Sequence, residues 1–219
     1  MWLTLNHRHT PNDWNVFGAS TDMLIRRYYE SRLKKGIVNP PESVCFMLTD
    51  RDVAGAPEKT NEVARWCCDL GIRHITFHVD TVSSEVLDFF LEKLKDISQF
   101  ARLKVYCNGR EEISGTGPYV NVAIGVSGRE EIVRCIRRMA EEGVNPAEVD
   151  EEMIESHLSF RYEPDLVIKA GGSHLTDFLI WQSVYSELFF TDVNWDEFRK
   201  LDLLRALRDY QTRKRRYGK

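Results

Sequence analysis

Segments with the hydrophobic spacing of strands alternate along this chain with segments that have the spacing of helices. Short apolar runs predict buried strands near Val44, Ile75, Val105, Val122 and Val167. Helical spacing recurs at residues 63–70, 86–94, 130–142, 149–158, 176–187 and 196–213. Strands that alternate with helices are typical of a parallel sheet covered by helices. We therefore expect a single α/β domain over residues 1–219, with a central, mostly parallel sheet flanked by helices on both faces.

The two ends of the chain lie outside the alternating strands and helices. We treat residues 1–20 as an N-terminal extension and residues 213–219 as a basic C-terminal tail. Residues 21–36 begin with polar capping candidates and end at a glycine, which predicts a helix before the first strand. The apolar side chains on one side of this amphipathic helix are Leu24, Ile25, Tyr28 and Leu33.

The balance of charge narrows the classes of partner. The formal net charge is −4, from 30 Lys and Arg against 34 Asp and Glu. A protein that binds nucleic acid over its whole surface is usually basic, so we expect no nucleic-acid partner. No apolar run approaches the roughly 18 to 20 residues of a membrane span, and the N-terminus lacks the apolar stretch of a secretory signal. We expect a cytoplasmic protein, whose basic tail either contacts a membrane surface peripherally or is an ordinary solvated terminus.

Neither the cysteines nor the histidines have the spacing of a metal site. The cysteines are odd in number and include no Cys-x-x-Cys pair, which argues against a disulfide framework and against a thiolate zinc site. We expect all of them to be reduced and most to be buried: Cys45, Cys67, Cys68, Cys107 and Cys135. His74 and His78 are four residues apart, but their segment alternates as a strand, so the two imidazoles do not share a helix face.

The ends of the predicted strands carry the candidate chemistry. The first strand, at residues 43–48, is followed by the polar loop Thr49-Asp50-Arg51-Asp52. In open parallel sheets ligands bind at the carboxyl ends of the strands. We therefore predict a pocket that is lined by Thr49, Gly128, Lys169, Gly171 and Thr176, in which a phosphate would rest against Lys169 and the backbone of Gly171 and Gly172.

Four ordered motifs resemble a known family. Residues 165–198 read DLVIKAGGSHLTDFLIWQSVYSELFFTDVNWDEF, and residues 121–133 read NVAIGVSGREEIV. These segments, with VARWCCDLGIRHITF at 63–77 and RRYG at 215–218, resemble the cis-prenyltransferases, the family of undecaprenyl and dehydrodolichyl diphosphate synthases. The resemblance implies a parallel sheet, a dimer, Mg²⁺ in the complex, and a hydrophobic tunnel for the growing isoprenoid chain. Side chains that either line such a tunnel or belong to the core are Phe89, Phe90, Leu91 and Leu94.

The resemblance also assigns roles to single residues. Lys169 stands where the family has the first of two arginines that bind isopentenyl diphosphate, His174 is the nearest substitute for the second, and Thr176 matches a serine. The residues that the resemblance implies in substrate binding are Lys169, Gly171, Gly172, His174, Thr176, Arg216 and Gly218. Glu187 matches a glutamate that helps to hold magnesium at the dimer interface, although an isolated acid on a helix can also be merely solvated.

One motif of the active family is missing. The first strand of active members ends in Asp-Gly-Asn-x-Arg, and its aspartate holds magnesium against the allylic diphosphate. Here Thr49 occupies the aspartate position, and Asp50 can serve as the carboxylate only if the register slips by one residue. Residues 78–81 read His-Val-Asp-Thr where active members have Phe-Ser-x-Glu-Asn. The allylic site is therefore predicted to be damaged, and no residue is assigned as catalytic.

These departures leave three hypotheses. The first is a catalytically deficient accessory subunit, similar to the Nogo-B receptor type, that completes the active site of a homologous catalytic partner in a heterodimer or heterotetramer. The alternative is a divergent homodimeric prenyltransferase, active on its own, in which Asp50 or Asp52 replaces the missing aspartate and His174 the arginine. The third is a lipid-binding module that holds a prenyl chain. The first two act on isopentenyl and allylic diphosphates.

Overall fold

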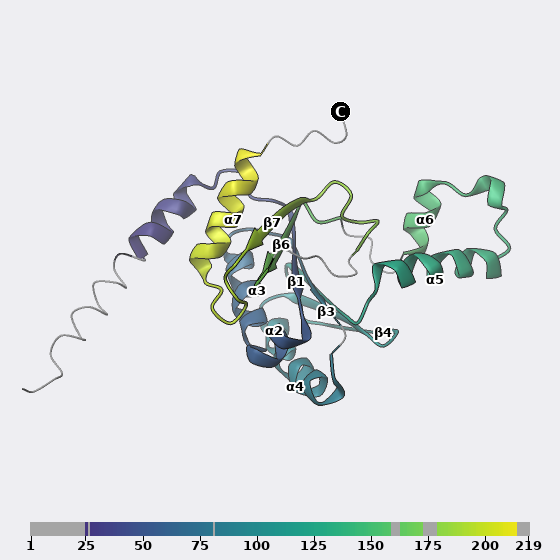
Figure 1. Cartoon of the computed structure of the whole chain (residues 1–219), viewed down its shortest axis with the longest axis horizontal. Helices are drawn as coiled ribbons and strands as arrows, with labels where there is room; N and C mark the ends of the chain where they lie inside the picture. Colours follow the sequence, from purple (N-terminus) through teal and green to yellow (C-terminus); the bar gives the residue numbers. More distant parts are fainter. Residues whose placement is uncertain (1–24, 26, 81, 159–162, 173–178, 214–219) are drawn as a thin grey trace, which may run out of the picture.

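A seven-stranded sheet runs through the part of the chain that the structure describes, in the order β4-β3-β5-β2-β1-β6-β7 (Figure 1). The computed structural model describes residues 25, 27–80, 82–158, 163–172 and 179–213. The strands are β1 (Ser43–Leu48), β2 (His74–Val79), β3 (Arg102–Cys107), β4 (Arg110–Ser114), β5 (Tyr119–Ile124), β6 (Leu166–Ala170) and β7 (Glu187–Thr191). All neighbouring strands pair in parallel except β3 and β4, which confirms the predicted α/β fold.

The helices follow the predicted alternation closely. They are α2 (Asp50–Gly55), α3 (Lys59–Asp69), α4 (Ser84–Leu94), α5 (Gly128–Glu141), α6 (Glu151–His157) and α7 (Lys200–Thr212), with short 3-10 helices at Lys95–Gln99 and Pro146–Glu148. Residues 27–36 are also helical, and we call them the N-terminal helix. In Figure 1 the α5–α6 pair projects from one side of the sheet, and the N-terminal helix lies on the other side, next to α7.

The main core lies on one face of the sheet. Alternate residues of β1 point to opposite faces, so Val44, Phe46 and Leu48 join α3, α4 and α7 in this core, while Cys45 and Met47 belong to a smaller cluster on the other face. Phe46 stacks on Phe77 with ring centroids 5.2 Å apart, and Trp195 stacks on Phe198 at 5.7 Å. Of the side chains proposed for a tunnel, Phe90 and Leu94 are buried in the main core and Phe89 is 51% exposed. Aromatic packing therefore joins the central strands to the segment before α7.

Two predictions about the elements were wrong. The helix predicted at 176–187 is not formed where the structure describes the chain: residues 180–185 are turns, and Glu187–Thr191 is strand β7. Pairing with β6 decides this conformation, which the local apolar spacing cannot reveal. The loop after β1 is a short helix, α2, rather than irregular chain.

Strand β4 was not predicted, for a related reason. Every residue of β4 is exposed, so the strand lacks the buried run that sequence patterns detect. It forms the antiparallel edge of the sheet after a tight turn, in which Asn108 has φ +51° and Gly109 φ +76°. Among the described residues, each helix is too short or too polar to cross a bilayer.

The aromatic core gives a test of this fold. Phe46→Ala should lower the free energy of unfolding by about 3 to 5 kcal/mol, because it leaves a cavity among packed rings. Phe89→Ala is the matched control, and its loss should stay near 1 kcal/mol or below, since half of the side chain is already in water. Urea denaturation followed by tryptophan fluorescence measures both. Equal losses for the two variants would contradict the assignment of the core.

Candidate functional site

Parallel pairing brings the ends of three strands to one edge of the sheet. Met47 of β1 pairs with His78 of β2 on one side and with Lys169 of β6 on the other. These residues therefore lie in one row across the sheet, each one residue before the end of its strand. The residues that follow, among them Thr49, meet at the carboxyl edge, where ligands bind in open α/β sheets. We call this region the crevice.

A capping box fixes the loop after β1. The Thr49 N–H and hydroxyl each donate a hydrogen bond of 2.8 Å to the Asp52 Oδ2, and the Asp52 N–H donates one of 3.3 Å to the Thr49 Oγ1. Thr49 is thus the N-cap of α2, and Asp52 is held beside the end of β1. Asp50 is exposed in the first turn of α2 and contributes to none of these bonds.

Lys169 faces this aspartate across the crevice. Its Nζ lies 3.7 Å from the Asp52 Oδ2, and the two side chains are only 8% and 16% exposed. The separation is longer than a hydrogen bond, so the attraction is that of two opposite charges. Within the described residues this ion pair is the only polar interaction of the Lys169 ammonium. A buried cation that forms no hydrogen bond with the described part of the chain has the chemistry that an anionic ligand needs.

His78 has a structural role at the same edge. Its ring is 1% exposed, and the Nε2 lies 2.8 Å from the carbonyl oxygen of Val126. This contact ties the end of β2 to the loop between β5 and α5. The next residue of that loop, Ser127, caps α5 by accepting a hydrogen bond from the Glu130 N–H, so Gly128 is the first residue of that helix.

The glycines after β6 build a turn rather than an open cradle. The Gly171 N–H donates to the carbonyls of Thr191 and Val193, at 3.0 and 2.9 Å, and the Gly172 N–H donates to Thr191 at 3.4 Å. Gly171 has φ +70°, and a Cβ there would lie 3.3 Å from the Asn194 Oδ1, so glycine is needed for the backbone and for the close approach. In this conformation both amides donate to the carbonyl oxygens of Thr191 or Val193, and the contact of a phosphate with this backbone stays a prediction.

Glu187 lies away from the crevice in its own chain. It pairs with Leu166 at the amino end of β6, three residues before Lys169, which corresponds to about 10 Å along a strand. Its carboxylate forms an ion pair of 3.0 Å with Arg213. It is a strand residue, not a helix residue as predicted, and a magnesium role for it stays a prediction that requires a second subunit.

Four of the predicted binding residues lie outside the described residues: His174, Thr176, Arg216 and Gly218. Their roles stay predictions. Conversely, the contact of Asp52 with Lys169 was not foreseen, although Asp52 was considered as a replacement carboxylate. The Thr-x-x-Asp spacing of a capping box was the signal that could have oriented this side chain.

The residues of the crevice do not fit a preformed magnesium centre. No group of three or more His, Cys, Asp or Glu side chains that could hold a metal occurs in the described parts of the chain. The Asp52 Oδ2 already accepts two hydrogen bonds from Thr49 and faces the Lys169 ammonium. Its charge is therefore compensated within the protein, and magnesium in the complex stays a prediction.

The cysteines offer no nucleophile to this edge. All five are free thiols, and Cys45, Cys67 and Cys135 are buried, as expected. Burial raises the pKa of Cys45, on β1, to about 12. A thiol with this pKa is protonated at neutral pH, so the chemistry of the crevice depends on Lys169 and the carboxylates.

The fold defines a mostly parallel α/β protein with polar and charged side chains at its strand ends, and known proteins identify the family. The model for putative undecaprenyl diphosphate synthases matches residues 90–218. Isoprenyl transferase 1 of Corynebacterium glutamicum is 34% identical over 200 residues, covering 74% of this chain and 89% of that protein. The tritrans,polycis-undecaprenyl-diphosphate synthase (geranylgeranyl-diphosphate specific) of Thermoplasma volcanium is 36% identical over 199 residues, covering 74% and 77%.

A solved structure agrees in fold. Lavandulyl diphosphate synthase from Lavandula x intermedia, in complex with dimethylallyl diphosphate, superposes with a TM-score of 0.65 at 22% identity, covering 82% of this chain and 99% of that one. The chain belongs to the undecaprenyl diphosphate synthase family of cis-prenyltransferases.

The coupling across the crevice can be measured. In a double-mutant cycle of Asp52→Asn and Lys169→Met, we expect the two changes to be non-additive by about 1 to 3 kcal/mol, because each leaves the other charge buried without its partner. Asparagine keeps an oxygen for the hydrogen bonds of Thr49, so the cap survives in the first variant. Chemical denaturation of the four proteins gives the coupling energy. Additivity within about 0.3 kcal/mol would show that the pair does not interact.

Proposed function

We propose that this chain is a cis-prenyltransferase that condenses isopentenyl diphosphate with an allylic diphosphate in the crevice. The observation that carries the proposal is the Lys169 ammonium, which is buried at the end of β6 and forms no hydrogen bond among the described residues. The position is the one at which the family resemblance implies an arginine on isopentenyl diphosphate. A diphosphate that enters the crevice would receive the donors of this cation.

Lysine at this position changes how the diphosphate is held. An arginine would bind two phosphate oxygens with a planar fork, whereas an ammonium acts as a point charge with three donors. Because Lys169 is almost completely buried, little water competes for it, and its attraction for a phosphate is stronger than at the surface. Its task is to bind and orient the diphosphate, while Asp52 offsets its charge.

The relatives support a chain that is catalytic by itself. The curated proteins that resemble it over most of their length are named as isoprenyl transferases or synthases. We therefore favour the divergent prenyltransferase over the accessory subunit as the leading hypothesis. In this reading, the exposed Asp50 is the carboxylate that remains available to a magnesium-bound diphosphate, since Asp52 is compensated by Lys169.

The accessory subunit is the second candidate, and one part of the chain favours it. Thr49 replaces the aspartate expected at the end of β1 and is fully engaged in capping α2. The match to the family model starts at residue 90, and the departures at Thr49 and at residues 78–81 both lie before the matched part of the chain. A homologous catalytic partner would supply what is missing there, and the tail with Arg216 and Gly218 would complete the site of that partner.

Both candidate functions involve a second subunit. We propose that this subunit binds to the projecting arm formed by α5 and α6. The two helices are joined by an ion pair of 2.9 Å between the His157 Nε2 and the Glu142 Oε2, and by a hydrogen bond from Arg138 to the carbonyl oxygen of His157. Large apolar side chains on α5 and the neighbouring turns are exposed: Val133, Ile136, Ile180, Val184 and Tyr185. A rigid arm with an apolar face supports subunit association.

Activity of the purified chain tests the proposal. With magnesium, isopentenyl diphosphate and farnesyl diphosphate, the chain alone should form polyprenyl diphosphate. Lys169→Met should lower kcat/KM by about tenfold to a hundredfold. The change removes a charge-assisted hydrogen bond to the diphosphate, and such a bond contributes about 1.5 to 3 kcal/mol. Lys95→Met, an exposed lysine on the 3-10 helix Lys95–Gln99, is the control and should change nothing.

The same assay separates the two candidates. A chain that is inactive alone but raises the activity of a homologue containing Asp-Gly-Asn-x-Arg would replace the leading hypothesis with the accessory one. If the chain is inactive in both assays and Lys169→Met binds inorganic pyrophosphate as the unchanged protein does, the crevice is not a diphosphate site.

Association through the arm has its own test. Ile136→Glu should shift the protein from dimer to monomer in sedimentation velocity, because it places a charge in an apolar contact. Ile113→Glu on the edge strand β4 is the matched control, since Ile113 is 55% exposed and Ile136 is 56% exposed. A dimer that survives the change in α5 would exclude the arm as the interface.

A further inference from the structure

The N-terminal helix is attached to the body at one end and leaves an apolar surface in water. The Val38 N–H donates a hydrogen bond of 3.1 Å to the Gln211 Oε1 of α7, and the Gln211 side-chain amide donates to the carbonyl oxygen of Gly36. Toward its start the helix is far less covered: Ile25, Tyr28 and Tyr29 are 49%, 62% and 51% exposed. Aromatic and apolar side chains that are half or more in water are unusual on a helix without a partner.

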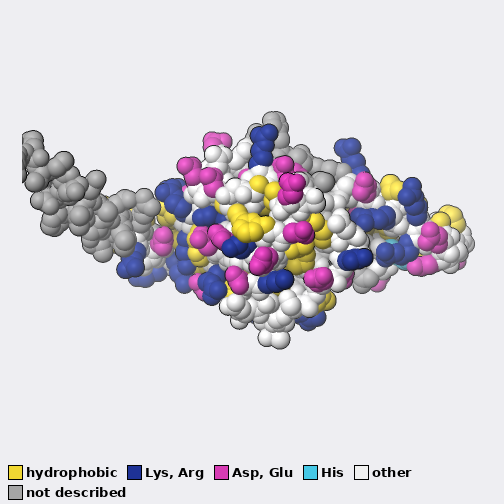
Figure 2. Space-filling model, turned by 90° about the horizontal axis from the view of Figure 1, so that it is seen from below, with side chains coloured by type: hydrophobic (Ala, Val, Ile, Leu, Met, Phe, Trp, Pro, Cys, Tyr) yellow, Lys and Arg dark blue, Asp and Glu magenta, His cyan; other side chains and the backbone are white. Residues whose placement is uncertain are grey.

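The same helix is strongly basic. Residues 26–35 contain five Lys and Arg and a single acid, Glu30, and the tail at 213–219 contains five more and no acid. Since the whole chain carries −4, the rest of the protein carries −13. Gln211 of α7 binds the end of the N-terminal helix, and the tail begins directly after α7. The end of one basic segment and the beginning of the other therefore lie close together. Figure 2 shows Lys and Arg side chains gathered where the described chain begins, beside the grey N-terminal residues.

A groove separates the N-terminal helix from α7. Its volume is about 980 Å³, and both walls supply arginines: Arg32 from the helix, and Arg205 and Arg208 from α7. Arg205 pairs with Asp202, whereas neither Arg32 nor Arg208 forms an ion pair with any described residue. Among the described residues, no ion pair therefore compensates the positive charges of Arg32 and Arg208.

We propose that this surface, formed by Ile25, Arg27, Tyr28, Tyr29, Arg32, Lys34, Lys35 and Arg208, docks the protein onto an anionic lipid membrane. A basic helix with exposed apolar and aromatic residues lies in the plane of a bilayer interface, its apolar side chains among the acyl chains and its cations near the headgroups. Tyrosine is enriched at this depth because its ring is apolar and its hydroxyl stays hydrated. The inference goes beyond the chemistry of the crevice and does not depend on it.

A membrane accounts for this surface better than the other polyanions. A nucleic acid would use the cations but gives Ile25 no apolar environment, because its outside is a charged phosphate backbone. An acidic protein would need a shaped interface, whereas the basic side chains of this surface are spread over an exposed helix and the arginines of the groove beside it. Anionic lipids move laterally, so their headgroups can pair with the cations wherever these lie on the surface. The acyl region takes up Ile25 and the rings of the two tyrosines.

Vesicle co-sedimentation of the full chain tests the inference. The protein should bind vesicles of phosphatidylcholine with about 30% phosphatidylglycerol and should not bind pure phosphatidylcholine, and binding should weaken as salt rises. The double variant Arg27→Glu, Lys34→Glu should bind about 30-fold more weakly or worse, from roughly one decade per 1.4 kcal/mol and about 1 kcal/mol for each basic residue.

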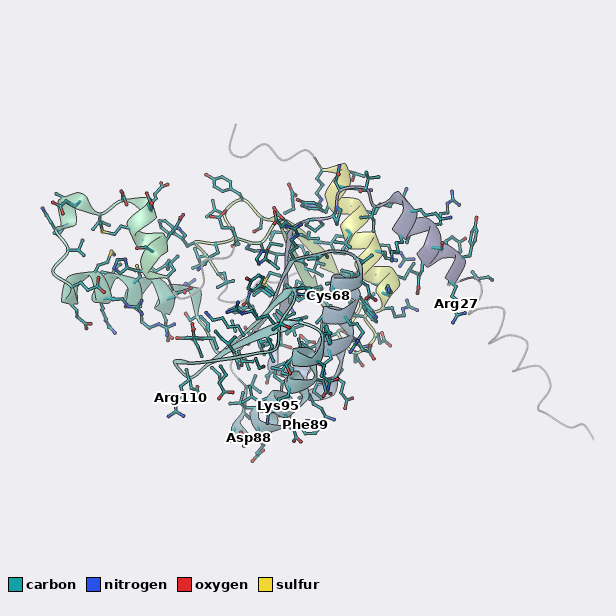
Figure 3. The ribbon with its side chains drawn as sticks, turned by 180° about the vertical axis from the view of Figure 1, so that it is seen from behind. Arg27, Cys68, Asp88, Phe89, Lys95 and Arg110 are labelled. Atoms are coloured by element: carbon teal, nitrogen blue, oxygen red, sulfur yellow. The ribbon has the colours of Figure 1, made fainter. Side chains whose placement is uncertain are left out.

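A matched control has the same change of charge elsewhere. Lys95→Glu, Arg110→Glu alters two exposed basic residues that lie far from Arg27 (Figure 3) and should bind vesicles as the unchanged protein does. Tyr28→Ser, Tyr29→Ser should remove the part of the binding that resists salt, because the apolar insertion is lost. Thermal denaturation should show that each variant melts within a few degrees of the unchanged protein.

Three results would overturn the inference. The first is equal binding to neutral and anionic vesicles. The second is an equal loss in the helix variant and its control, which would reduce the effect to overall charge. The third is an absence of vesicle binding together with binding to duplex DNA that Arg27→Glu, Lys34→Glu abolishes, which would identify the surface as a nucleic-acid site.

Discussion

The parallel pairing of β1 between β2 and β6 is the constraint on which the rest of the structure depends. It places Met47, His78 and Lys169 in one row, and therefore brings the ends of three strands that are distant in sequence to one edge of the sheet. The aromatic packing of Phe46 and Phe77 below this row resists any slip in register, because a shift of one residue would turn these rings to the other face.

Within the crevice, one carboxylate has two tasks. Asp52 completes the cap of α2 with Thr49 and compensates the charge of Lys169. Both side chains are nearly buried, so water screens the attraction between them only weakly. Lys169 is the group that we propose for a diphosphate, and the chain departs from the family pattern both at Lys169 and at Thr49.

The surface of the molecule has two distinct regions on opposite sides of the sheet. On one side the α5–α6 arm carries an apolar face that suits a second subunit, and on the other the N-terminal helix and α7 concentrate positive charge (Figure 1). The arm is the surface that we propose for a second subunit, and the N-terminal helix with α7 is the surface that we propose for an anionic membrane.

The sequence by itself determined the α/β class, the five buried parallel strands and the flanking helices, because buried runs and helical spacing are local signals. It also pointed to Lys169, since family motifs preserve spacing along the chain. Only the tertiary structure decided the rest. The edge strands β4 and β7 exist through pairing with β3 and β6, the amides of Gly171 and Gly172 are used by the turn to β7, and Glu187 lies at the amino end of the sheet. The meeting of Asp52 with Lys169 joins residues 117 positions apart, and no local pattern encodes such a contact.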